Sequence, residues 1–136
     1  MPFKDASEVY DYIGGVFKVA LAREGLGDKL AASGVILQLR YSEPEAVITV
    51  DMPNREVSTG ETELKPTVVL TSKAEAGHKF WLGKLNLTVA LARGEVKARG
   101  PVTKLLKLVP IASQLFPEYR KILEERGRQD LIAEAG

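Results

Sequence analysis

The apolar stretch Phe80–Gly100 (FWLGKLNLTVALARGEVKARG) changes its pattern at two glycines, and these changes limit the folds available to the chain. A first helical segment ends at Gly83, because glycine destabilises a helix interior by about 1 kcal/mol relative to alanine. A second short apolar piece, Leu85–Ala92, is compatible with a helix or a strand, and we favour a helix. After Gly94, Glu95–Arg99 alternates as a half-buried strand does. The stretch contains no recognisable reaction site, and we interpret it as the wall of an apolar binding site.

The composition is that of one globular domain. The chain has 136 residues, 45% of them hydrophobic, which suffices for a substantial core. We expect a single domain over residues 1–126 and a loosely held tail over 127–136. The absence of cysteine excludes disulfides and a cysteine nucleophile, and a net charge of +1 does not favour nucleic acid as a partner. The chain has neither a basic and apolar leader nor about 20 consecutive apolar residues, so we expect a soluble, cytoplasmic protein.

Four further segments are predicted to be strands. Val35–Tyr41 and Ala46–Met52 alternate between apolar and polar residues, and their short connection predicts an antiparallel hairpin. A brief strand is expected at Arg55–Ser58, followed by another at Leu64–Thr71.

Helices are predicted before and after these strands. A first helix begins near Asp5 or Ser7, both good N-cap residues, and runs to about Glu24. Ser72 and Glu75 match a capping box, which predicts the start of the helix that ends at Gly83.

The helix predicted to begin at Pro101 is apolar around most of its circumference. Lys104 and Lys107 form only a narrow polar stripe on it. Such a helix must be buried on two sides or must lie over something apolar. Pro110 is expected to kink it, and Pro117 to begin a last helix.

The order of these parts resembles the sterol-carrier-protein-2 family of lipid-binding domains. The resemblance rests on Val68-Val69-Leu70-Thr71-Ser72, Gly83-Lys84-Leu85-Asn86, Ala90-Leu91-Ala92-Arg93-Gly94, Glu95-Val96-Lys97-Ala98-Arg99-Gly100 and Lys104-Leu105-Leu106-Lys107-Leu108. It covers nearly the whole chain, although Leu87 stands where many members have proline. The resemblance implies an α/β (α+β) fold with a mainly antiparallel sheet of about five strands, covered on one face by helices that enclose an apolar tunnel.

The resemblance also implies a function without catalysis. The expected activity is the binding, transfer or shielding of a lipid, such as a fatty acid, fatty acyl-CoA, sterol or isoprenoid, with no cofactor, metal or catalytic residue. Two alternatives stay open. One is a protein-interaction module, such as a homodimer, and the other is an accessory subunit that presents a lipid-like substrate to a partner enzyme.

The candidate ligand-binding residues are apolar side chains of the predicted wall and helices: Phe17, Phe80, Trp81, Leu85, Leu87, Leu91, Leu105, Leu106, Val109 and Phe116. Aromatic residues at helical spacing are more often ordinary core, which is the competing interpretation. Lys84, Lys104 and Lys107 are candidates for contact with a lipid headgroup or an anionic membrane, the alternative being a solvated basic face that also includes Lys97 and Arg99. His78, the single histidine, is predicted to lie at the surface.

Overall fold

A five-stranded mixed sheet forms the base of the structure. The computed structural model describes residues 2–134. The strands lie in the order β3-β2-β1-β4-β5, with bounds β1 Ile36–Ser42, β2 Ala46–Asp51, β3 Glu56–Thr59, β4 Val68–Lys73 and β5 Val96–Arg99. β1 and β4 pair in parallel, and the other three neighbouring pairs are antiparallel. The prediction of a mainly antiparallel sheet is confirmed.

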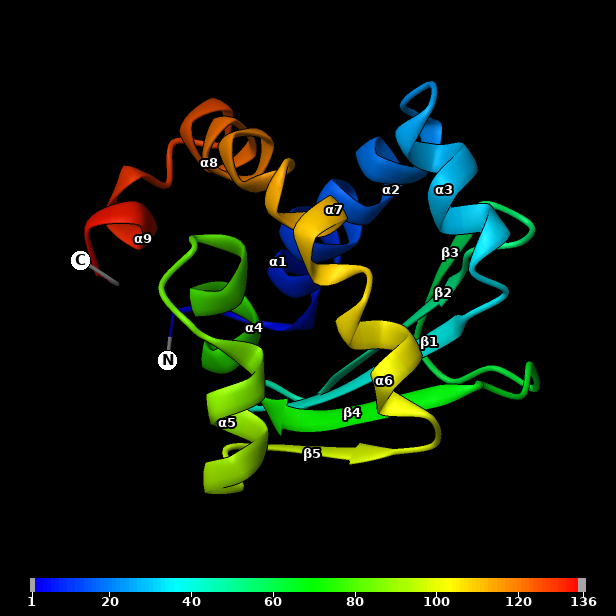
Figure 1. Cartoon of the computed structure of the whole chain (residues 1–136). Helices are drawn as coiled ribbons and strands as arrows, with labels where there is room; N and C mark the ends of the chain where they lie inside the picture. The colour runs from blue at the N-terminus through cyan, green and yellow to red at the C-terminus, as the bar shows by residue number, and fades with distance from the viewer. Residues whose placement is uncertain (1, 135–136) are drawn as a thin grey trace.

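Short helices make up the rest of the fold. Figure 1 shows them gathered on one side of the sheet, with α5 next to one end of β5. Their bounds are α1 Ala6–Val9, a π-helical turn η1 Tyr10–Gly14, α2 Gly15–Ala22, α3 Leu26–Ala32, α4 Ala74–Trp81, α5 Leu87–Arg93, α6 Val102–Leu106, α7 Val109–Ser113, α8 Phe116–Glu125 and α9 Gln129–Glu134.

The two faces of the sheet differ in polarity. Leu37, Leu39 and Tyr41 of β1 share the apolar face and are buried in the core. On the opposite face Gln38 donates a hydrogen bond to Thr49 on β2, and Arg40 bonds both Gln38 and Glu61. β3 and β4 run in the same direction, so the connection between them must cross β2 and β1. The Arg40–Glu61 ion pair ties this crossing segment to the polar face.

Most predicted helices and strands are present, but the predicted start of α4 is wrong. The hairpin, the brief strand β3, the short helix α5 and the strand β5 are confirmed. α5 ends at Gly94, whose φ of 78° is a conformation that favours glycine. The capping box is wrong, because Ser72 still belongs to β4, its hydroxyl donates to the carbonyl of Lys73, and α4 begins at Ala74.

The helix predicted from Pro101 to about Leu115 is two helices. α6 ends at Leu106 and α7 begins at Val109 with Pro110 in its first turn. Proline has no N–H to donate to the carbonyl four residues earlier, and its ring crowds that carbonyl, so a continuous helix is disfavoured here. Pro117 lies in the first turn of α8, as predicted.

The C-terminal segment differs from the loosely held tail predicted over 127–136. α9 places Leu131 in the core with no exposed surface. Arg128 forms an ion pair with Glu8, in which both side chains are only 14% exposed, and it also bonds the carbonyl of Pro2. These contacts hold the segment to the start of the chain. Residues 135–136 lie outside the described part.

We predict that Arg128→Ala destabilises the fold by about 1–3 kcal/mol, because it removes charge-assisted hydrogen bonds from a partly buried carboxylate. Arg126→Ala is a matched control, since Arg126 pairs with Asp11 where both side chains are about half exposed, and it should cost less than about 1 kcal/mol. Urea denaturation of both variants measures the difference. Equal effects would contradict the structural role of α9.

The Arg128 contribution should depend on pH. Partial burial acts to raise the pKa of Glu8, but hydrogen bonds from Arg128 and the Lys4 backbone outweigh it, and the pKa lies below its ordinary value of 4.5. A carboxyl group whose pKa is lowered by folding stabilises the fold above its unfolded pKa and loses this contribution as pH falls through the folded pKa. The stability difference between wild type and Arg128→Ala should therefore be constant at neutral pH and shrink below pH 4.5. A difference that persists unchanged in acid would contradict the pairing.

Candidate functional site

An apolar cavity lies between the sheet and the helices. Its volume is about 90 Å³, and it is partly open to solvent. The sheet side is formed by Leu37, Leu39, Tyr41, Val50, Met52, Leu70, Ser72 and Val96. The helix side is formed by Phe17, Ala20, Leu21, Leu26, Leu30, Ala76, Gly77, Phe80, Trp81, Leu85, Leu87, Leu105, Leu108, Val109 and Ala112.

The cavity wall carries almost no polar chemistry. Among the described residues, no charged side chain lines it, and Tyr41 and Ser72 supply its hydroxyl groups. The described part of the chain also has no group of three or more acidic or histidine side chains arranged to hold a metal ion. The arrangement suits the burial of an apolar molecule, for which area matters more than particular side chains.

An aromatic cluster joins three helices beside the cavity. The ring of Trp81 on α4 meets Phe17 of α2 at 5.1 Å and Phe80 at 5.3 Å, both edge to face. Phe116 of α8 meets Phe80 at 5.6 Å in the same manner. Aromatic pairs prefer this arrangement, and each contributes about 0.5–1.5 kcal/mol beyond its buried area. The cluster holds α4 in place as one wall of the cavity.

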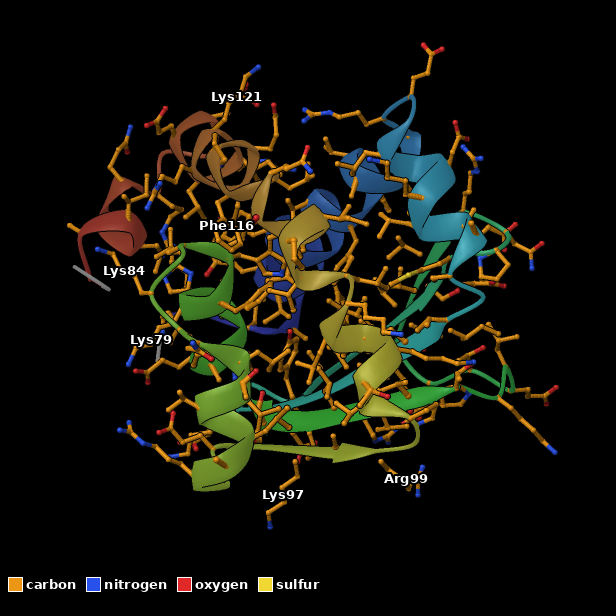
Figure 2. The ribbon with its side chains drawn as sticks, in the orientation of Figure 1. Lys79, Lys84, Lys97, Arg99, Phe116 and Lys121 are labelled. Atoms are coloured by element: carbon orange, nitrogen blue, oxygen red, sulfur yellow. The ribbon has the colours of Figure 1, made fainter. Side chains whose placement is uncertain are left out.

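Seven of the ten candidate ligand-binding residues line the cavity: Phe17, Phe80, Trp81, Leu85, Leu87, Leu105 and Val109. Leu91, Leu106 and Phe116 do not line it, and instead pack half-buried against the core. Phe116 lies behind the wall, where its ring contacts Phe80 and Trp81. Figure 2 shows it at the start of α8, among the packed side chains.

The sheet side of the cavity was missed as a site by sequence reasoning. The alternation in β1 placed Leu37, Leu39 and Tyr41 on one face, and this signal could have marked them as wall residues. Leu26 and Leu30, four residues apart on α3, also line the cavity. The sequence pattern that buries these side chains is the same whether they face other side chains or an open space, so it could not separate the two.

The basic residues do not all lie on one part of the surface. Lys84 follows α4, Lys104 lies on α6 and Lys107 follows it, and all three are exposed. Figure 2 shows Lys97 and Arg99 of β5 pointing away from the helices, whereas Lys84 lies near α4. Lys84 therefore lies apart from Lys97 and Arg99. Contact of Lys84, Lys104 and Lys107 with a headgroup stays a prediction. Within residues 2–134, no helix has the length and apolar character needed to cross a membrane.

The surface position predicted for His78 is wrong. His78 is buried, with its Nδ1 atom 2.8 Å from the hydroxyl of Tyr119 and its Nε2 atom 2.9 Å from the carbonyl oxygen of Leu131. These bonds connect α4 to α8 and α9. The partners follow 41 and 53 residues later in the chain, so no local pattern around His78 could reveal them.

Comparison with known proteins finds no protein-family profile and no curated protein that matches the sequence. Solved structures do match. A ubiquinone synthesis protein, described as UbiJ-SCP2, has a TM-score of 0.60 at 19% identity, covering 85% of this chain and 95% of that one. Sterol carrier protein 2 like 2 of Aedes aegypti has a TM-score of 0.60 at 19% identity, covering 76% and 95%. Sterol carrier protein 2 of Aedes aegypti in complex with the C16 fatty acid palmitate has a TM-score of 0.55 at 15% identity, covering 79% and 94%. The chain has the fold of sterol-carrier-protein-2 domains.

We predict that Leu105→Ala and Leu106→Ala have different effects on stability. Leu105 is 7% exposed and lines the cavity, so its truncation should cost about 2–4 kcal/mol. Leu106 is half-buried, and its truncation should cost about 1 kcal/mol. Thermal or urea denaturation of both variants measures this. The reverse order would contradict the orientation of α6.

Proposed function

We propose that the protein reversibly binds a lipid in the cavity between its sheet and its helices, without catalysing a reaction. The observation that carries this proposal is the apolar wall of the cavity, to which both layers of the fold contribute. Burial of an acyl chain of about sixteen carbons is worth about 0.8 kcal/mol per methylene, or on the order of 12 kcal/mol. Association and ordering costs of several kcal/mol reduce this to binding in about the micromolar range.

The cavity is bordered by small side chains at positions where larger ones would fit. Larger side chains at half-buried wall positions, such as Ala76 and Ala112, would fill it. Small residues at these positions suit a space that a ligand occupies.

A long chain requires the cavity to widen into a tunnel. The elements that can yield are α6 and α7, which are five residues each and separated by Lys107 and Leu108. Leu105, Leu108 and Val109 form their contribution to the wall. We propose that this pair of helices shifts outward as the lipid enters, with the wall around Phe80 and Trp81 held by the aromatic cluster.

Two comparisons support a lipid as the ligand. The structure with palmitate has this fold, and so does the protein named for ubiquinone synthesis. The second name favours a further candidate function, in which this chain presents its lipid to an enzyme that modifies it. Co-purification with an enzyme that acts on the lipid found in the cavity would support presentation, whereas exchange of lipid between vesicles with no enzyme present would support transfer.

Native mass spectrometry of the purified protein, followed by organic extraction, tests the proposal first. The expected result is a discrete lipid bound to the protein. If the protein is isolated empty, titration with palmitate should quench the fluorescence of Trp81, the single tryptophan and a wall residue. An empty protein that also fails to respond to palmitate would contradict lipid binding.

We predict that Ala112→Leu reduces palmitate binding at least about tenfold while stability is kept or increased, because the larger side chain fills the space that the lipid needs. Ala92→Leu is the matched control: Ala92 lies on α5, is exposed and does not line the cavity. Calorimetric titration and thermal denaturation give the two readouts. Equal binding by both variants would place the ligand elsewhere.

A further inference from the structure

The two residues that supply hydroxyl groups to the cavity wall occupy paired strand positions at one end of it. Tyr41 is the last of the three cavity-lining positions on β1, and its partner in the parallel pairing with β4 is Ser72. Leu37, the first of these positions, is about 13 Å away by the rise of a strand. Between them the cavity face of β1 carries only Leu39. The cavity is thus polar where β1 approaches α4 and apolar towards α3.

The Tyr41 hydroxyl group can donate a hydrogen bond into the cavity. Tyr41 is 8% exposed, and its hydroxyl lies against Gly77, where an added methyl group would approach within 2.5 Å of it. The hydroxyl has no hydrogen-bond partner among residues 2–134, although every fully enclosed side-chain nitrogen or oxygen in that range is partnered. The oxygen is therefore not fully enclosed, and the space beside it is the cavity that Tyr41 lines. Burial raises the pKa of Tyr41 above its ordinary value of 10.0, so the group keeps its proton.

Ser72 complements this donor. Its hydroxyl proton is used in a bond of 3.0 Å to the carbonyl of Lys73, which leaves the lone pairs of the oxygen to accept. Tyr41 can donate and Ser72 can accept. An alcohol, which accepts one hydrogen bond and donates another, satisfies both groups.

A charged headgroup does not suit this end of the cavity. In the part of the chain that the structure describes, no cation lines the wall, so a carboxylate beside Tyr41 would lose its water without gaining a counter-charge. A fatty acid therefore places its carboxylate outside the cavity, away from Tyr41.

We infer that the cavity prefers a long-chain alcohol, whose hydroxyl group lies between those of Tyr41 and Ser72. The inference rests on the proposed lipid-binding function and specifies its ligand. Tyr41 and Ser72 bind the headgroup, and the apolar wall from Leu39 to Leu30 receives the chain.

Titration with dodecanol and dodecanoate, followed by Trp81 fluorescence, tests this in wild type and variants. Tyr41→Phe keeps the ring and should weaken dodecanol binding about 3- to 10-fold, the effect of one neutral hydrogen bond, with dodecanoate unchanged. Ser72→Ala should also weaken dodecanol selectively. Tyr10→Phe is the control, because the Tyr10 hydroxyl contacts the backbone N–H of Val47 and does not line the cavity. Thermal denaturation confirms that each variant is folded.

The outcomes separate this inference from the function on which it rests. A selective loss of dodecanol binding in Tyr41→Phe and Ser72→Ala supports the alcohol site. Equal losses for both ligands, or no loss for dodecanol, would overturn the alcohol site and leave the lipid cavity standing. A wild-type protein that binds neither ligand would overturn both.

Discussion

Burial of the apolar face of β1 is the constraint on which the rest of the structure depends. β1 is the central strand, paired with β2 on one side and β4 on the other, so Leu37 and Leu39 lie at the middle of the sheet. The helices that cover this face are short and come from distant parts of the chain. Such a cover leaves space above the strand where one long helix would pack densely. The cavity follows from this arrangement.

Hydrogen bonds and an ion pair, outside the cavity wall, hold part of this helical layer together. His78 links α4 to α8 and α9, and Arg128 links the start of α9 to Glu8 at the beginning of the chain. Both connections lie away from the cavity wall. These polar contacts join α4 to the C-terminal helices, whereas α6 and α7 contribute wall residues without such contacts among the described residues.

Local patterns in the sequence predicted most elements and failed at contacts between distant segments. The alternation in residues 35–52 determined the hairpin, and Gly83 and Gly94 marked the ends of α4 and α5. The capping-box pattern at Ser72 was overridden because pairing with β1 extends β4 as far as Lys73. The burial of His78 and Leu131 depends on packing between α4 and α9, which no local pattern encodes.

The sequence predicted which part of the chain forms the candidate site, but it did not predict which side chains line the cavity. Apolar periodicity identified the helix side through Phe80, Trp81 and Leu105, yet it also selected Leu106 and Phe116, which pack outside the wall. The hydrophobic effect favours the burial of all of these side chains. Only their orientation relative to β1 decides which of them face the cavity. The position of Tyr41 and Ser72 at one end depends on the parallel register of β1 and β4, which the sequence pattern did not reveal.

The most direct test of the central claim is an NMR measurement with a fatty acid that carries a nitroxide spin label on its chain. If a lipid occupies the space between the sheet and the helices, the methyl signals of Leu37, Leu70 and Ala112 should broaden strongly, because all three side chains line the cavity. Signals of Val89 and Leu64, which are 43% and 36% exposed, should keep their width. Broadening confined to these exposed side chains, with the cavity signals unchanged, would contradict an internal lipid site.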